Sequence, residues 1–225
     1  MSKILVIAEY VDGKVKKATL TTLDMARQLA AKKGASIDIA VLGSGIGGIA
    51  DALKGYGAGT IYVADHADLA HALAPTWAKV IADIAEEAGA DVIAASASTL
   101  GKDILPRVAA RLEAGMASDV VAVVDTDDGP GFRRPMWAGA LLADVVIDTD
   151  TWVVTARGSA FDAAAESGGE SAVEAFDAEP ELASARTRFV SFDGTKSDRP
   201  TLDEADIVVA GGRGLKSAEG FAQVI

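Results

Sequence analysis

A run of five apolar residues, Ile4-Leu5-Val6-Ile7-Ala8, opens the chain and has the length and β-branched content of a buried strand. Four similar runs follow at residues 37–42, 61–64, 92–95 and 120–124. Between them, apolar residues recur at every third or fourth position in segments 22–33, 46–54, 75–87 and 100–113. This alternation predicts an α/β fold in which right-handed crossovers place helices on both faces of a parallel sheet.

The expected ends of the helices carry local signals. Thr21 or Thr22 could cap the first helix, and Gly34 follows two lysines at its end, as a C-terminal glycine should. Pro75 suits the first turn of the third helix. These signals support helices at those positions.

The pattern changes after Asp125. Residues 127–131, Asp-Asp-Gly-Pro-Gly, predict a tight turn, and strand-like segments follow at residues 132–137, 140–147 and 152–157. We expect two or three antiparallel strands appended to the parallel sheet. Residues 161–179 have little periodicity and predict a mobile excursion, after which residues 186–192 could return as a strand.

Composition excludes several classes of function. Among 225 residues the net charge is −12, which disfavours nucleic acids and anionic membranes as partners. The absence of cysteine excludes thiolate catalysis, cysteine-ligated clusters and disulfides within this chain. Neither a signal-peptide pattern nor a membrane-length apolar run is visible, so the sequence predicts a cytoplasmic chain without direct membrane insertion.

One glycine-rich loop satisfies the formal pattern of a dinucleotide site. Gly43-Ser44-Gly45-Ile46-Gly47-Gly48 follows a predicted strand, and Asp65 lies about 20 residues further on. However, the loop follows the second strand rather than the first, and its helix is soon interrupted by glycines. A tight structural turn is the favoured interpretation, and nucleotide binding is the alternative.

Other polar groups are weaker candidates. His66, Asp68 and His71 could form a metal site or an acid–base pair, but a third spaced ligand is missing and loop histidines are commoner. The aspartates at 125, 127 and 128 favour a hairpin turn over a calcium loop. We therefore predict no metal site.

The segment after the fourth expected strand is more informative. Ser98 and Thr99 lie where open α/β sheets bind ligands, although either could simply cap the next helix. No nucleophile, base and orienting residue are arranged together, so we predict no catalytic residues. Scattered tryptophans are usually core or interface residues, and we expect this of Trp77, Trp137 and Trp152.

The final residues predict the start of a second domain. Ile207-Val208-Val209-Ala210 is strand-like and runs into the turn Gly211-Gly212-Arg213-Gly214, which opens a helix. One strand and a short helix cannot bury a core. We therefore expect a domain over residues 1–193, a linker over 194–204 and a truncated domain over 205–225, whose unpaired strand is disordered or borrowed by a neighbour.

Several motifs in this order resemble the α subunit of electron transfer flavoproteins. The matching segments are residues 5–9, 98–110, 134–139 (Arg-Pro-Met-Trp-Ala-Gly), 157–164, 197–200 and 209–217. The resemblance implies a three-layer fold like that of adenine nucleotide hydrolases, and a heterodimer in which this chain pairs with a β subunit around one FAD. It also implies an electron carrier rather than an enzyme. In such carriers, electrons pass from dehydrogenases, such as the acyl-CoA dehydrogenases of fatty acid β-oxidation, to a quinone oxidoreductase or another acceptor.

Carried over to this chain, the resemblance makes Gly212, Arg213 and Gly214 the start of the FAD site, with most contacts beyond residue 225. A guanidinium beside a flavin can stabilise its anionic reduced form or pair with phosphate. The implied location is cytoplasmic in a bacterium and the mitochondrial matrix in a eukaryote. The alternative is a free-standing ATP- or AMP-binding module of the universal-stress-protein type, which would use the loops at 43–48 and 96–102.

Overall fold

A computed structural model describes residues 2–179, 187–191, 193, 202, 205 and 207–224. The chain divides into two compact units, Met1–Ser191 and Phe192–Ile225, and each is described by itself. The predicted linker over residues 194–204 falls almost entirely outside the described residues.

The first unit is built on a seven-stranded sheet in the order β12-β5-β4-β1-β6-β11-β7, in which every pair is parallel. Its strands are β1 (Lys3–Ile7), β4 (Ser36–Gly43), β5 (Thr60–Asp65), β6 (Val92–Ser96), β7 (Gly115–Val120), β11 (Trp152–Ala156) and β12 (Ala172–Ala175). The predicted α/β class and parallel sheet are confirmed. The first four expected strands lie within about two residues of their predicted positions.

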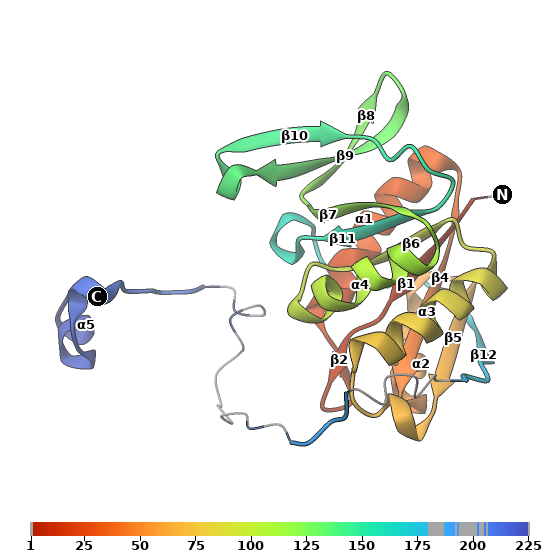
Figure 1. The fold of residues 1–225 in the computed structure, drawn as a ribbon, viewed down its shortest axis with the longest axis horizontal. Helices are drawn as coiled ribbons and strands as arrows, with labels where there is room; N and C mark the ends of the chain where they lie inside the picture. Colours follow the sequence, from red (N-terminus) through yellow and green to blue (C-terminus); the bar gives the residue numbers. More distant parts are fainter. Residues whose placement is uncertain are drawn as a thin grey trace. The chain divides into compact units, whose positions relative to one another are not determined.

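Helices cover both faces of this sheet (Figure 1). They are α1 (Lys17–Lys33), α2 (Gly47–Leu53), α3 (Ala74–Ala88) and α4 (Thr99–Arg111), with short 3₁₀ turns η1 (Lys54–Tyr56) and η2 (Ala67–Leu69). Side chains of α1 and α2 pack with Ile4 and Val6 of β1, whereas α3 and α4 pack with Leu5 and Ile7. Successive strand residues thus supply two separate cores, one on each face.

Two of the predicted helix ends are confirmed and one is wrong. Gly34 ends α1 in the left-handed conformation at φ 65°, and Pro75 lies in the first turn of α3. The first helix begins at Lys17, one turn before the predicted start, with Lys16 at the N-cap position. The hydroxyls of Thr21 and Thr22 instead donate to the Ala18 carbonyl, so neither caps the helix.

The antiparallel extension is confirmed, but its strands differ from those predicted. Its strands are β8 (Ala122–Thr126), β9 (Gly129–Met136) and β10 (Leu141–Val145), in the order β10-β9-β8, with η3 (Trp137–Gly139) joining β9 to β10. The single strand predicted over 120–124 is divided in the structure, because β7 ends at Val120 and β8 begins at Ala122. The segment 152–157 was expected in the extension, but β11 inserts into the parallel sheet between β6 and β7.

The segment after β11 contains more regular structure than predicted. It begins with η4 (Gly158–Ala160), and its last part forms β12, which pairs in parallel with β5 at the sheet edge. Phe161 and Ala164 are buried in the α1 core. The expected excursion therefore contains one short strand, and the mobility predicted for residues 161–179 stays a prediction. Residues 187–191 form no strand, contrary to the expectation for 186–192, whose end residues lie outside the described part.

Smaller elements complete the two units. The hairpin β2 (Tyr10–Val11) and β3 (Lys14–Val15), which was not predicted, follows β1. In the second unit, residues 207–210 form no ladder with another described strand, so the unpaired strand expected there stays a prediction. The turn η5 (Arg213–Leu215) and helix α5 (Ala218–Val224) do follow, as the sequence indicates.

Candidate functional site

The crevice between β1 and β6 is where an open α/β sheet of this topology would receive a ligand. Strand β4 lies on one side of β1 and β6 on the other, so the strand order reverses here. The carboxylate of Glu9 enters this crevice and is 5% exposed. Its Oε1 accepts a hydrogen bond from Ser98 Oγ at 2.6 Å, and its Oε2 lies 3.9 Å from Lys16 Nζ. The chain therefore fills this position with its own anion.

Ser98 has two roles in that crevice. Besides binding Glu9, its Oγ accepts from the Gly101 amide at 3.0 Å and so caps α4, which confirms the capping interpretation. Gly101 lies so close to β6 that an added Cβ would stand 1.9 Å from the Ser96 carbonyl oxygen. Close packing of the first turn of α4 against β6 leaves little room beside Ser98.

A carboxylate of the chain also occupies the glycine-rich loop at residues 43–48. Asp65 Oδ1 accepts from the Gly45 amide at 2.8 Å, and Oδ2 accepts from the Ile46 amide at 3.1 Å. The Tyr10 hydroxyl donates to Leu42 O and would stand 1.9 Å from a Cβ at Gly43. Burial, and after it the charge of Asp65, raises the pKa of this hydroxyl. The amides that would bind a pyrophosphate are bonded to a carboxylate of the chain, so the geometry favours a structural turn.

The weaker candidates have structural roles. His66 Nδ1 accepts from the Asp68 amide at 3.1 Å, while the His71 ring stacks on Phe189 with 3.5 Å between centroids. Within the described residues there is no group of three side chains able to hold a metal ion. Asp127 and Asp128 form the turn between β8 and β9, which confirms the hairpin interpretation.

An ion pair at the ends of β7 and β11 was missed by the sequence reasoning. The Arg157 guanidinium binds both carboxylate oxygens of Asp119, at 3.1 and 2.5 Å, and this contact holds the pKa of Asp119 below its ordinary value. Asp119 has a left-handed φ of 59° beside an irregularity in the β7–β11 register, and its amide donates to Thr155 Oγ1. The signal available in the sequence is the family-like segment 157–164, which begins with Arg157.

The three tryptophans differ in environment. Trp77 is buried and donates from Nε1 to Leu69 O at 3.3 Å. Trp152 is half-buried, makes an edge-to-face contact with Phe132, and lies under the Lys33 ammonium at 3.6 Å. Trp137 is 78% exposed at the end of the β9–β10 hairpin. The first two thus belong to the folded body.

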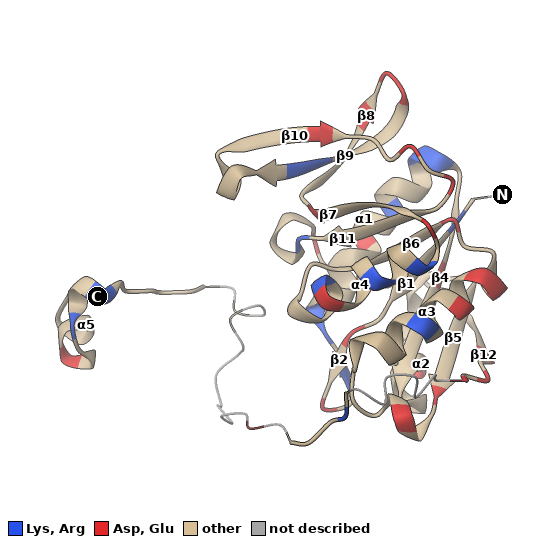
Figure 2. Ribbon diagram, viewed as in Figure 1, with Lys and Arg blue, Asp and Glu red and all other residues tan. Residues whose placement is uncertain are grey.

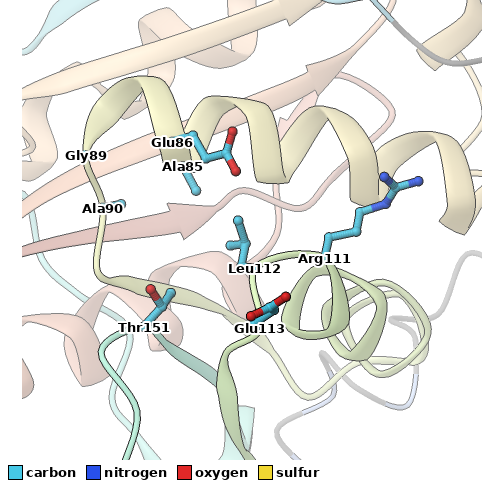
Figure 3. A pocket seen from close by; sticks show the side chains of 8 residues that line it. All are labelled: Ala85, Glu86, Gly89, Ala90, Arg111, Leu112, Glu113 and Thr151. Carbon is cyan, nitrogen blue, oxygen red and sulfur yellow. The ribbon is translucent and has the colours of Figure 1, made fainter.

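A hollow of about 350 Å³ lies where α3 and α4 end (Figure 3). Its lining combines the apolar Leu112 with the charged side chains of Glu86, Arg111 and Glu113. These charges include both signs, and the carboxyl ends of the parallel strands, where such folds bind ligands, lie at the other edge of the sheet. We assign no function to this hollow.

The second unit contains the residues that the family resemblance assigns to FAD. The turn around Arg213 borders a hollow of about 530 Å³, lined also by Lys216, Ser217 and Phe221. Gly212 and Gly214 leave open space where a Cβ would lie, and the residues that the structure describes include no ion-pair partner for Arg213. Two cations, a hydroxyl and an accessible backbone are a donor set that fits a phosphate or an anionic flavin.

The first unit is thus a parallel α/β domain of nucleotide-type topology whose anion-binding positions are filled by its own carboxylates.

Within the described residues, no helix is long and apolar enough to cross a membrane.

Comparison with known proteins identifies the family. The family model described as the electron transfer flavoprotein domain matches residues 4–181. Electron transfer flavoprotein subunit alpha of Pseudomonas aeruginosa is 37% identical over 97% of this chain and 67% of its own length. Protein FixB of Clostridium saccharobutylicum is 33% identical over 97% of this chain and 66% of its own length. The mitochondrial electron transfer flavoprotein subunit alpha of Dictyostelium discoideum is 34% identical over 98% of this chain and 64% of its own length.

The chain therefore belongs to the electron transfer flavoprotein family and matches its alpha subunits. It spans about two-thirds of the length of these relatives.

Proposed function

We propose that this chain acts within the α subunit of a heterodimeric, FAD-containing electron carrier. The observation that carries the proposal is the match to electron transfer flavoprotein alpha subunits over almost the entire chain. The closed crevice at Glu9 and the closed loop at Asp65 support a scaffold rather than a nucleotide-binding module.

In this proposal the carrier takes electrons from dehydrogenases, such as acyl-CoA dehydrogenases, and passes them to a quinone oxidoreductase or another acceptor. The bound FAD would supply the redox chemistry, and the protein would set its position and electrostatic surroundings. The first unit would pack against the β subunit. Arg213, between Gly212 and Gly214, would be this chain's direct contribution to the flavin site.

Reconstitution with the β subunit tests this function. We would mix an α subunit of the relatives' full length that contains this chain with the β subunit of the same organism, add FAD, remove unbound flavin, and measure the mass and absorbance of the product. We expect a one-to-one complex with the absorption band of oxidised flavin near about 450 nm. A chain that forms no complex with the β subunit would refute the subunit assignment.

Arg213→Ala tests the contribution of the turn. Loss of a charge-assisted contact should lower the amount of flavin retained by the complex by about tenfold at a limiting FAD concentration. Lys14→Ala removes an exposed cation from β3 and is the matched control, with flavin retention equal to that of the wild type. Equal retention in Arg213→Ala and wild type would show that Arg213 does not contact FAD.

A further inference from the structure

The end of the β9–β10 hairpin exposes an unusual concentration of apolar side chains. We call residues 136–142 the hairpin tip. Within residues 2–179, seven large apolar side chains are strongly exposed, and four of them lie in this tip. They are Met136 (42%), Trp137 (78%), Leu141 (59%) and Leu142 (63%). Single exposed apolar residues are ordinary, but a concentration of this kind indicates a contact surface.

Both faces of the hairpin tip are open. Met136 pairs with Leu141 on the face that carries Phe132, which is fully buried four residues before Met136. Leu142 pairs with Pro135 on the opposite face and is also exposed. The hairpin face that packs on the parallel sheet at Phe132 is thus exposed to solvent at Met136. Figure 1 shows the hairpin extending past the neighbouring strands. A partner that covers this tip must enclose it from two sides.

The hairpin tip is held in a strained conformation. Trp137 and Ala138 have left-handed φ angles of 52° and 55°, which cost about 1–2 kcal/mol for each residue with a side chain. Below the tip, Arg133 on β9 and Asp144 on β10 form a two-pronged ion pair with distances of 2.7 and 2.8 Å, visible as facing basic and acidic segments in Figure 2. Strain combined with fixed geometry is typical of preorganised contact sites.

Cations surround the base of the tip. Arg134 Nη2 donates to Ser118 Oγ at 3.1 Å, while its buried Nε has no hydrogen-bond partner. Arg157 pairs with Asp119, and Lys102 and Arg134 lie close enough to that carboxylate to lower its pKa further. Cations outnumber carboxylates in this group, in a chain whose net charge is −12. The expected complement is acidic.

We propose that the hairpin tip inserts into an apolar cleft of the partner subunit, whose rim presents carboxylates toward Arg134. This inference rests on the proposed function, because it names the surface by which the α chain would hold the β subunit. The tip exposes on the order of 500 Å² of apolar surface, against about 800 Å² per partner in an ordinary interface. It would therefore form the centre of the interface, with Trp137 as its main anchor.

A second copy of this chain fits less well. In a two-fold dimer the same patch meets itself, so the Arg134 groups of the two copies would approach each other without opposing carboxylates. Two chains with a charge of −12 each also repel. An anionic membrane surface would be repelled by the same net charge.

Substitutions in the hairpin tip test this inference. Trp137→Ala and the double variant Leu141→Ser/Leu142→Ser would be titrated against the β subunit by calorimetry, and circular dichroism would verify folding. We expect Kd to rise at least about tenfold for the first and about a hundredfold for the second. Val11→Ser and Val173→Ser, which alter two strongly exposed apolar residues away from the tip, should change Kd less than about threefold.

The outcomes separate this inference from the proposed function. If the wild-type chain binds the β subunit and both tip variants bind within about threefold of it, the docking surface is wrong while the function stands. If the wild-type chain does not bind the β subunit, the function itself fails. Light scattering of the chain alone should give a monomer mass, and a dimer that the double variant dissociates would overturn the inference in favour of a second copy.

Discussion

Phe132 is the side chain on which the position of the whole hairpin depends. It is fully buried on β9, where its ring meets Trp152 of β11 edge-to-face with 5.9 Å between centroids. Phe132→Ala would lose about 1.5–3 kcal/mol of transfer free energy. A cavity of up to roughly 100 Å³ would cost about 2 kcal/mol more where the site cannot collapse. We expect the free energy of unfolding to fall by about 3–5 kcal/mol.

Urea denaturation followed by tryptophan fluorescence measures this loss, with the dependence of stability on urea expected to stay unchanged. Leu142→Ala is the matched control, since Leu142 lies on the same hairpin but is 63% exposed, and its effect should stay within about 0.5 kcal/mol. A double-mutant cycle with Trp152→Ala should give a coupling of about 1 kcal/mol for the ring pair. A loss below about 1.5 kcal/mol in Phe132→Ala would refute the view that the hairpin is fixed through this core contact.

Three further predictions concern the body of the first unit. Gly101→Ala places a Cβ against the Ser96 carbonyl and should cost about 1–3 kcal/mol, whereas Gly48→Ala in α2 meets open space and should be neutral or stabilising; calorimetric melting of both distinguishes them. Asp65→Ala removes the acceptor of the Gly45 and Ile46 amides and should cost about 0.5–1.5 kcal/mol in a chemical melt, whereas Asp128→Ala in the turn between β8 and β9 should have little effect. The contact with Arg157 lowers the folded-state pKa of Asp119, so the stability that its charge contributes is present above the unfolded pKa and is lost as pH falls through the folded pKa. The difference in unfolding free energy between wild type and Asp119→Asn should therefore shrink below about pH 4. A difference that stays constant with pH would contradict this.

The sequence predicted the regular part of the fold because each of its signals is local. A buried parallel strand reads as a short apolar run, and Gly34 and Pro75 identify helix ends by their own backbone preferences. The start of α1 was misplaced because Lys16 caps it without a side-chain hydrogen bond, and the nearby threonines suggested a cap that does not form.

The topology after Val120 was not predictable from such signals. Residues 120–124 are one apolar run, but the chain leaves the parallel sheet at Val121 and starts an antiparallel strand, with both parts half-buried or buried. Strands β7 and β11 are parallel neighbours without an α-helix between them, so the antiparallel excursion β8–β10 supplies the crossover that a helix usually provides. A strand that follows a hairpin was naturally assigned to that hairpin.

The candidate sites show a similar division. The sequence favoured a structural turn at residues 43–48, but it could not show that Asp65 itself would bond the amides of the loop, because that contact spans about twenty residues and depends on the pairing of β4 with β5. The contact between Glu9 and Ser98 depends in the same way on the adjacency of β1 and β6. The domain boundary near residue 193 and the role of Arg213 stay predictions.

These two carboxylates explain how a fold suited to nucleotides can serve as a scaffold. An anion-binding loop leaves several amides oriented toward one point, and without a ligand that arrangement loses hydrogen bonds when the surrounding chain is packed. Asp65 and Glu9 supply the missing anions from within the chain, so the carboxyl edge of the sheet is stable with no nucleotide bound. Binding must then take place on other surfaces. The hairpin tip exposes apolar area and the Arg213 turn exposes cationic charge, so these are the surfaces at which a partner subunit and a cofactor should first be sought.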